Sequence, residues 1–205
     1  MPKYLPRFGF SDRLNHWTIA LAFFLAALSG LAFFHPALYW FSYLFGGGSW
    51  TRILHPFIGL FLVLAFAKFF MRHWRENVMT EQDEEWRRTT QSAIFFEGVM
   101  PPSGMFNAGQ KVMFWTMVGC IVVMLATGIM FWRPWFEGLF PVLLMRIAAV
   151  LHAVAATVFV ITVIGHIYVA YWTKGTIRGM TRGTVTEGWA RTFHVYWYQQ
   201  MTGRK

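Results

Sequence analysis

The chain has 205 residues, of which 56% are hydrophobic, 20% aromatic and only 13% charged. Soluble domains carry about 25% charged residues, so this composition excludes an ordinary soluble protein, and the aromatic content excludes a disordered one. The formal charge of +9 comes from basic residues between apolar runs, which indicates membrane orientation and not nucleic-acid binding. The single cysteine, Cys120, excludes a CxxCH haem attachment and a four-cysteine iron–sulfur cluster held by this chain alone. Metal chemistry must therefore use histidine.

Four apolar stretches are close to the roughly 20 residues that cross a bilayer and are predicted as membrane spans. They cover residues 14–34, 53–70, 110–132 and 146–172. A polar loop (73–109) and a tail (173–205) are predicted on the cytoplasmic side, together with the N-terminus, because most basic residues lie there. The chain is thus expected to be one all-α domain, an integral membrane antiparallel four-helix bundle in the bacterial inner (cytoplasmic) membrane.

Two histidines lie well inside the fourth span. His152 and His166 are 14 residues apart, which corresponds to about 21 Å of helix and to about 40° less than four whole turns. The two side chains are therefore predicted on nearly the same face, at opposite depths of the membrane. Because a histidine in lipid is costly unless it faces the bundle interior and has a partner, each is expected to pair with a group on another helix.

Running the chain through the membrane supplies these partners. The first span begins on the inner side near His16, and the second begins on the outer side near His55. We therefore pair His16 with His166 and His55 with His152. Two imidazoles from different helices at each level fit two bis-histidine b-type haems. The 21 Å between His152 and His166 excludes one tetrahedral zinc or copper ion bound by all four.

The surrounding residues are compatible with flat macrocycles. Ala20 and Gly59, one helical turn after His16 and His55, are expected to let a ring system approach the backbone, although small residues also serve helix packing. Phe159 is expected between the two levels.

Two other histidines are rivals for these roles. His35 precedes a proline and His73 follows Arg72 among charges, so both are predicted as surface or interfacial residues. Pro56 follows His55 and is expected in the first turn of its helix, where the missing N–H costs little.

Several segments resemble the gamma subunit of respiratory, membrane-bound formate dehydrogenase, a four-span dihaem cytochrome b. The matching segments are 12–18, 52–57, 107–111 with 113–115, 132–134, and 172–180. The resemblance covers nearly the whole chain, and the order and spacing of the segments together make it specific. The resemblance implies that His55 and His152 bind the outer haem b and that His16 and His166 bind the inner one.

The resemblance also implies a pocket for a quinone, either menaquinone or ubiquinone, beside the inner haem. Its lining residues are Asn107, Ala108, Gly109 and Gln110. Taken by themselves, the same residues predict a helix start, with Asn107 as N-cap and Gln110 completing a capping box. The two roles are compatible.

The implied function is electron transfer from the outer side of the membrane inward to the quinone, with no open iron site and no catalytic residue for formate on this chain. The implied partners are an iron–sulfur (beta) subunit and a catalytic molybdenum or tungsten formate-oxidising (alpha) subunit, and a higher oligomer of the complex is left open. One alternative is the cytochrome b anchor of a nickel–iron hydrogenase or a related quinone-linked oxidoreductase. Another is a haem-free anchor or a proton-relay transporter.

Overall fold

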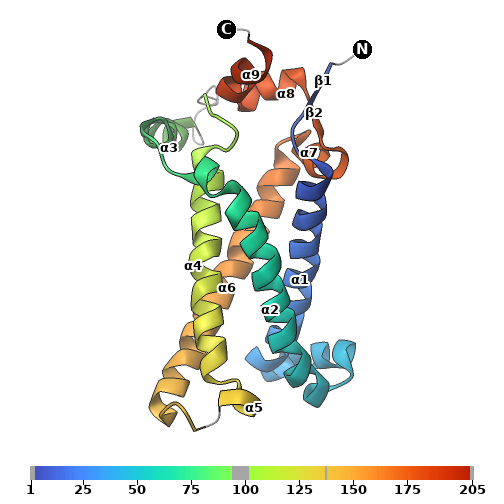
Figure 1. Cartoon of the computed structure of the whole chain (residues 1–205), viewed down its shortest axis with the longest axis vertical. Helices are drawn as coiled ribbons and strands as arrows, with labels where there is room; N and C mark the ends of the chain where they lie inside the picture. Colours follow the sequence, from blue (N-terminus) through green and yellow to red (C-terminus); the bar gives the residue numbers. More distant parts are fainter. Residues whose placement is uncertain (1–2, 94–101, 137, 204–205) are drawn as a thin grey trace. The chain divides into compact units, whose positions relative to one another are not determined.

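The computed structural model describes residues 3–93, 102–136 and 138–203. Parts of the predicted loop (94–101) and of the predicted tail (204–205) therefore lie outside the described residues. The elements, in order, are β1 (Tyr4–Pro6), α1 (Phe10–Phe34), η1 (Pro36–Phe45), α2 (Gly48–His73), η2 (Arg75–Asn77), α3 (Glu81–Ala93), α4 (Ala108–Met130), α5 (Arg133–Phe136), α6 (Val142–Trp172), α7 (Thr176–Arg182), β2 (Thr184–Thr186), α8 (Glu187–Phe193) and α9 (Val195–Thr202) (Figure 1).

Among the residues that the structure describes, four helices, α1, α2, α4 and α6, are long and apolar enough to cross a membrane. The shortest, α4, has 23 residues, about 35 Å at 1.5 Å per residue, compared with a hydrocarbon core of about 30 Å. The predicted spans 14–34, 53–70 and 146–172 fall within α1, α2 and α6. The predicted third span begins inside α4 and extends two residues past its end at Met130.

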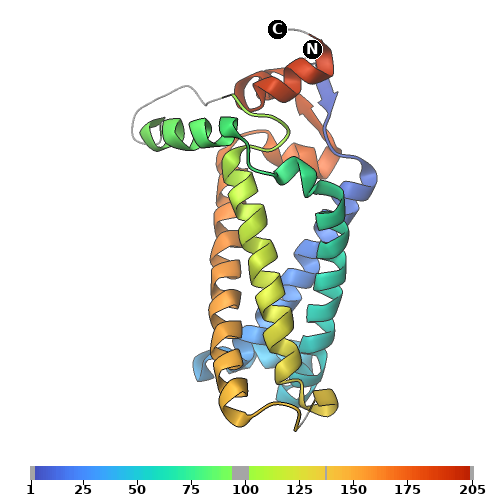
Figure 2. The ribbon, with the colours of Figure 1, turned by 60° about the vertical axis from the view of Figure 1, so that its left-hand side comes forward.

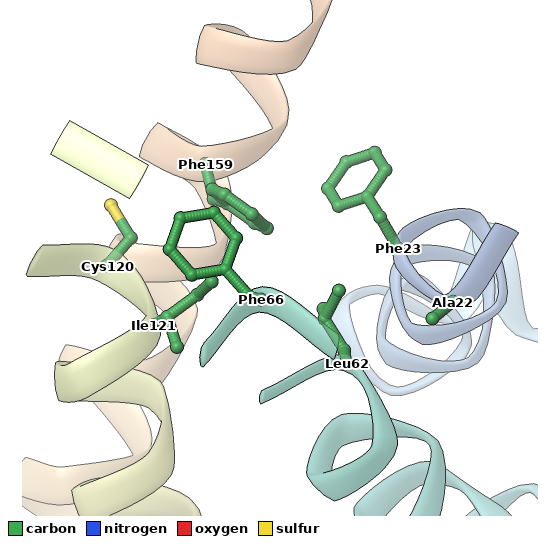
Figure 3. Packing of buried hydrophobic residues seen from close by; sticks show 7 residues of the cluster. All are labelled: Ala22, Phe23, Leu62, Phe66, Cys120, Ile121 and Phe159. Carbon is green, nitrogen blue, oxygen red and sulfur yellow. The ribbon is translucent and has the colours of Figure 1, made fainter. Parts of the chain in front are cut away.

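The membrane helices pack through side chains that all four contribute, in a compact unit formed by residues 14–70 and 116–165. The buried cluster consists of Ala22, Phe23, Leu62, Phe66, Cys120, Ile121 and Phe159. Figure 3 shows these side chains extending from the helices into a shared space. The rings of Phe23 and Phe159 meet edge to face, with centroids 5.1 Å apart. Burying such rings contributes about 1.5–3 kcal/mol each, so Phe159 belongs to the core of this unit.

The second membrane helix begins earlier than expected. α2 starts at Gly48, so Pro56 lies inside the helix and its expected place in the first turn is wrong. The early start follows from the glycine turn after η1, where Gly46 has a φ of 86° and Thr51 Oγ1 donates to the Gly47 carbonyl at 2.9 Å. A proline cannot donate to the carbonyl four residues before it, so Pro56 interrupts the helical hydrogen bonding beside His55.

A second compact unit contains residues 3–13, 71–93, 102–115 and 166–203. In it, β1 pairs antiparallel with β2, with Leu5 opposite Val185. Around this pair lies a buried cluster of Leu5, Val185, Trp189, Ala190, Trp197 and Tyr198. Gly183, which precedes β2, has a φ of 77°, and a Cβ there would stand 2.7 Å from the Phe8 carbonyl oxygen. The close approach of the N-terminal strand therefore requires glycine at this position.

Within this second unit, α3 is fastened to the start of α4, across which it lies in Figure 2. Lys111 Nζ donates to Asp83 Oδ2 at 2.6 Å, and both side chains are only 9% exposed. Burial alone would raise the pKa of Asp83, but the hydrogen bonds from Lys111 and Thr80 lower it below its usual value. The acidic first turn of α3 thus has one buried anchor, within the segment predicted as a polar loop.

Candidate functional site

The membrane unit brings two of the predicted histidines together. His55 extends from α2 and His152 from α6, both half-buried, and their ring centroids lie 6.3 Å apart with the ring planes at 64°. Two imidazole nitrogens bound to one metal ion at about 2 Å each lie about 4 Å apart. The centroids of two such rings lie farther apart than their bound nitrogens, so the observed centroid distance accommodates one metal ion between the rings.

Each of these rings has a buried hydroxyl at its Nδ1 atom. Ser29 Oγ of α1 lies 2.8 Å from Nδ1 of His55, and Thr127 Oγ1 of α4 lies 3.0 Å from Nδ1 of His152. Both hydroxyls also donate to backbone carbonyls one turn earlier, at 2.8 Å for Ser29 and 2.6 Å for Thr127. A hydroxyl has one proton. When the hydroxyl donates this proton to a backbone carbonyl, the hydroxyl oxygen accepts a hydrogen bond from the ring's Nδ1–H.

This arrangement determines which nitrogen is available to a metal. With Nδ1 protonated, the neutral imidazole keeps its lone pair on Nε2, the state in which histidine binds a metal. His55 and His152 therefore fit the axial ligands of a b-type haem by their donor chemistry and their spacing.

A glycine lies against each of the two rings. A Cβ at Gly30 would stand 3.2 Å from Cε1 of His55, and a Cβ at Gly128 would stand 3.4 Å from Cε1 of His152. Each glycine directly follows the hydroxyl residue that contacts the same ring. The same two-residue pattern thus recurs on α1 and α4 and supports one histidine on each side. Apart from the neighbouring turns of its own helix, no described atom lies within 4 Å of a Cβ built at Gly59. The role predicted for Gly59, to let a flat macrocycle approach the backbone, stays a prediction.

The other predicted pair is divided between the two compact units. His16 lies on α1 in the membrane unit, where its ring meets Trp17 edge to face with centroids 5.2 Å apart. His166 lies on α6 in the second unit, and both histidines are half-buried. Their pairing remains a prediction.

The four residues predicted to line the quinone pocket form the start of α4. The backbone N–H of Asn107 donates to Gln110 Oε1, and the backbone N–H of Gln110 donates to Asn107 Oδ1, both at 2.9 Å. These reciprocal bonds are a capping box, as predicted. Ala108 is buried, and the Cβ position of Gly109 lies 3.6 Å from the Trp86 ring of α3.

The two rival histidines differ in their surroundings. His35 is exposed, as predicted, and its Nδ1 accepts the Ala37 N–H that begins η1. Of the prediction that His73 is a surface or interfacial residue, the surface part is wrong, because His73 is only 5% exposed, whereas the interfacial part stays a prediction. His73 Nδ1 lies 2.7 Å from Glu76 Oε2, and Nε2 lies 3.8 Å from Asp12 Oδ1. The charges around it are partners of a buried ring and do not indicate solvent.

A half-buried arginine in the second unit was not predicted from the sequence. The Arg7 guanidinium lies over the rings of Trp189 and Trp197, 4.6 and 4.9 Å from their centroids, and it donates to the Met105 carbonyl at 2.7 Å. Burial lowers the pKa of Arg7 to about 9, which leaves it charged at neutral pH. The aromatic faces replace part of the lost hydration by cation–π attraction.

Arg7 also determines the state of a second buried histidine. Its Nη2 lies 3.3 Å from Nε2 of His194, and because arginine only donates, this nitrogen must accept. The ring's Nδ1–H then donates to the Gly104 carbonyl at 2.7 Å. Burial, together with the charge of Arg7, lowers the pKa of His194 to about 3. These contacts hold the segment that leads into Asn107 against the C-terminal helices.

Comparison with known proteins gives consistent matches. The family model described as prokaryotic cytochrome b561 matches residues 7–183. The nitrate-inducible formate dehydrogenase cytochrome b556(Fdn) subunit of Escherichia coli is 38% identical over 200 residues, covering 97% of this chain and 92% of that protein. The formate dehydrogenase cytochrome b556(fdo) subunit of the same organism is 37% identical, covering 95% and 92%. The formate dehydrogenase cytochrome b556 subunit of Haemophilus influenzae is 34% identical, covering 92% and 79%.

Proposed function

Because this chain belongs to the prokaryotic cytochrome b561 family, we propose that it is the dihaem membrane subunit of a formate:quinone oxidoreductase. Membership makes it a membrane-bound, haem-containing electron-transport protein, and its relatives are subunits of formate dehydrogenases. The proposal adds the number of haems, their ligands, the direction of electron flow and the quinone. The observation that carries it is the meeting of His55 and His152, each with Nδ1 on a buried hydroxyl.

The proposed architecture is an antiparallel four-helix bundle in the inner membrane, with both termini and the loop 73–109 in the cytoplasm. Two observations support it. The four membrane helices share one buried cluster, and basic residues concentrate before α1, between α2 and α4, and after α6. By the positive-inside rule these segments stay in the cytoplasm.

In this proposal His55 and His152 hold the outer haem through their Nε2 atoms. When bound, the haem iron supplies one-electron redox chemistry. Ser29 and Thr127 orient the two rings, and the apolar cluster around Phe159 keeps water away from the path between the levels. Two imidazole ligands leave no open position on the iron, so the site carries electrons without activating oxygen.

His16 and His166 hold the inner haem in the proposal, at the cytoplasmic level. The quinone binds beside it, at the start of α4 formed by Asn107, Ala108, Gly109 and Gln110. In that role the Asn107 and Gln110 side chains exchange part of their capping bonds for bonds to a quinone oxygen. The histidines would thus hold redox groups at two levels, so that electrons would move inward from the level of His55 and His152 to the level of His16 and His166 and on to the quinone.

The electrons come from another chain. Relatives named as formate dehydrogenase subunits support an iron–sulfur subunit docked at the outer level and a molybdenum or tungsten subunit that oxidises formate beyond it. Inward electron transfer with proton uptake from the cytoplasm charges the membrane, at about 2.3 kcal/mol per charge and 100 mV. Formate oxidation supplies this free energy.

The test is spectroscopic and uses the complex purified from membranes. We expect a b-type band in the reduced-minus-oxidised spectrum, with about two haems per copy of this chain, and reduction of that band by formate. His152→Ala and His166→Ala should each lose about half of the haem. His166→Ala should also abolish quinone reduction while formate still reduces the remaining haem. His35→Ala is the matched control, because His35 is exposed and should leave both haems in place.

Three results would contradict the proposal. Unchanged haem content in both variants would reject the ligand assignment. Reduction by hydrogen and not by formate would assign the chain to a hydrogenase. A wild-type spectrum without a b-type band would leave a haem-free anchor.

A further inference from the structure

A buried histidine lies between two carboxylates at the end of α2, apart from all four proposed haem ligands. His73 is 5% exposed, and its Nδ1 lies 2.7 Å from Oε2 of Glu76, whose side chain is 47% exposed. On the other side of the ring, Nε2 lies 3.8 Å from Oδ1 of Asp12, whose side chain is 8% exposed. Titratable groups therefore run from the surface of the second unit into its interior.

The chemistry of this arrangement suits proton transfer. An imidazole can take a proton on one nitrogen and release another from the second. The 2.7 Å contact is in the range of a charge-assisted hydrogen bond between Glu76 and His73. Proton exchange between the exposed carboxylate and the buried ring then needs no movement of the backbone.

Asp12 has a different part. Arg72 forms an ion pair with its carboxylate, and the Gly9 N–H donates to Oδ2 at 3.1 Å. The 3.8 Å between Asp12 Oδ1 and His73 Nε2 is longer than a hydrogen bond. Asp12 therefore acts on the ring through its negative charge, which stabilises the imidazolium that exists while a proton passes. The charged groups around His73 include Glu76, Asp12 and, through Asp12, Arg72.

The turn that carries His73 is fastened to the start of α4. The Asn77 side chain donates to the His73 carbonyl at 2.8 Å, and the Asn77 carbonyl accepts from Trp115 Nε1 at 2.9 Å. One residue later, the Val78 carbonyl accepts from Lys111 Nζ at 3.0 Å. Trp115 and Lys111 both belong to the first turns of α4, so the histidine and the capping box are parts of one packed region.

The ring of His73 itself contacts the residue before the capping box. It meets the ring of Phe106 edge to face, with centroids 5.8 Å apart, and Phe106 is followed directly by Asn107. The contacts therefore lead from water at Glu76, through His73, to the segment in which the quinone is proposed to bind.

We propose that Glu76 and His73 form a proton relay that supplies the site of quinone reduction with protons from the cytoplasm. The inference rests on the proposed function. One quinone takes up two electrons, delivered by the chain's haem groups, and two protons to give one quinol. For each proton, cytoplasmic water delivers a proton to Glu76, Glu76 protonates His73 at Nδ1, and the ring releases its Nε2 proton toward a quinone oxygen. The neutral ring then carries its proton on Nδ1, and rotation about the Cβ–Cγ bond presents the bare Nε2 to Glu76 for the next proton. Two passes, each followed by this rotation, complete the quinol.

The competing explanation is that this cluster only links the ends of α1 and α2. A structural link would change haem content and the yield of assembled complex when it is removed. A relay would change the rate of proton-coupled quinone reduction and its solvent isotope effect, while haem content and haem reduction stay the same. The two roles therefore separate in one set of measurements.

The experiment compares Glu76→Gln and His73→Gln in membranes that contain the complex. The haem is first reduced with formate, a soluble menaquinone or ubiquinone analogue is then mixed in, and haem reoxidation is followed in H2O and in D2O. Glu84→Gln is the matched control, because Glu84 is a half-exposed glutamate of α3 in ion pairs with Arg87 and Arg88. Glutamine keeps the size of Glu76 and its ability to accept from the ring, so this variant should assemble normally.

We expect both relay variants to slow haem reoxidation at least tenfold and to increase the solvent isotope effect. A positioned proton donor typically contributes a factor of about 100 or more, so a tenfold loss is a modest threshold. Haem content and the rate of reduction by formate should equal those of the wild type and of Glu84→Gln. If His73→Gln fails to assemble, Glu76→Gln decides alone. Wild-type rates and isotope effect in Glu76→Gln would overturn the relay, and loss of haem in Glu76→Gln would establish the structural link in its place. Wild-type haem that formate reduces but quinone does not reoxidise would refute the quinone step of the proposed function, and the relay with it.

Discussion

Ser29 Oγ lies 2.8 Å from Nδ1 of His55, which belongs to a neighbouring helix, and Ser29 is fully buried. The serine hydroxyl donates to the Leu25 carbonyl one turn earlier, so its oxygen is the acceptor for the ring. Removing that oxygen leaves a ring N–H without this partner in the membrane, and an unsatisfied buried donor costs about 1–3 kcal/mol. The hydroxyl therefore holds His55 in the state that binds a metal through Nε2.

Replacement of this hydroxyl should weaken the outer haem site. We expect Ser29→Ala to lower the retention of one of the two haems by about 10-fold or more, the usual effect of losing an outer-shell partner. Haem content after detergent extraction and the reduction potential of the outer haem are the two measurements. The matched control is Ser42→Ala, because Ser42 is also fully buried but its Oγ has no hydrogen-bond partner among the residues that the structure describes. Equal behaviour of the two variants would contradict the role of Ser29.

The glycines beside the two rings provide a second test. In Gly30→Ala the new methyl group would stand 3.2 Å from Cε1 of His55, and in Gly128→Ala it would stand 3.4 Å from Cε1 of His152. Such contacts push the ring away from its bonded position, so both variants should lose the outer haem preferentially. Difference spectra of purified protein, with haem counted per chain, measure the loss.

Both variants share a control in a membrane helix. Apart from the neighbouring turns of its own helix, alanine at Gly119 in α4 would meet no described atom within 4 Å. Because alanine is the better helix former, Gly119→Ala should be neutral or should stabilise the helix by up to about 1 kcal/mol. Haem loss from all three variants alike would show that small side chains are needed for helix packing in general.

The outer pair of histidines and the glycines beside it show what the sequence can and cannot predict. The lengths of the apolar runs and the depths of the histidines follow from the chain itself, since helix rise and membrane thickness are fixed quantities. The meeting of His55 with His152 was therefore predictable. Which glycine lies against a histidine ring depends on how the neighbouring helix is rotated, and that is set by contacts between helices. Gly30 reaches the His55 ring from another helix, so spacing along α2 does not indicate it.

His73 shows the same limit at the end of a helix. Its neighbour Arg72 is a charged residue at a helix terminus, which ordinarily indicates solvent. In the structure the Arg72 side chain is largely exposed, whereas that of His73 is buried between carboxylates from α1 and η2. Burial of this ring depends on Asp12, which is far away in the sequence, so local charge gives the wrong answer.

The second unit should loosen in mild acid because of His194. Burial and Arg7 lower the pKa of His194 to about 3 from an ordinary 6.5, so between these values the unfolded segment binds more protons than the folded one. The stabilisation is complete above pH 6.5 and is lost as the pH falls toward 3, by up to about 1.4 kcal/mol per pH unit. Hydrogen exchange of β1, β2, α8 and α9 at pH 7.5 and 4.5 measures it. His194→Gln, which cannot titrate, should flatten this dependence, and an unchanged dependence in that variant would assign the effect to another group.

The ion pair between Lys111 and Asp83 should hold α3 onto α4. Both side chains are 9% exposed and joined at 2.6 Å, so removing one leaves the other charge buried without this partner, at a cost of about 3–5 kcal/mol. Asp83→Asn should therefore expose the segment around α3 to limited proteolysis. The combined change Asp83→Asn with Lys111→Met should restore much of the protection, because no buried charge then remains in the pair.

Glu84→Gln on the same helix is the control, since the ion pairs of Glu84 with Arg87 and Arg88 are solvent-exposed and contribute about 0–1 kcal/mol. The lowered pKa of Asp83 means that this contact persists below the ordinary pKa of an aspartate, because the stabilisation from a carboxylate with a depressed pKa is present above its ordinary pKa and is lost as the pH falls through the folded value. Loss of protection in the double variant equal to that in Asp83→Asn would show that the attachment of α3 depends on the charges themselves and not on avoiding an unpaired one.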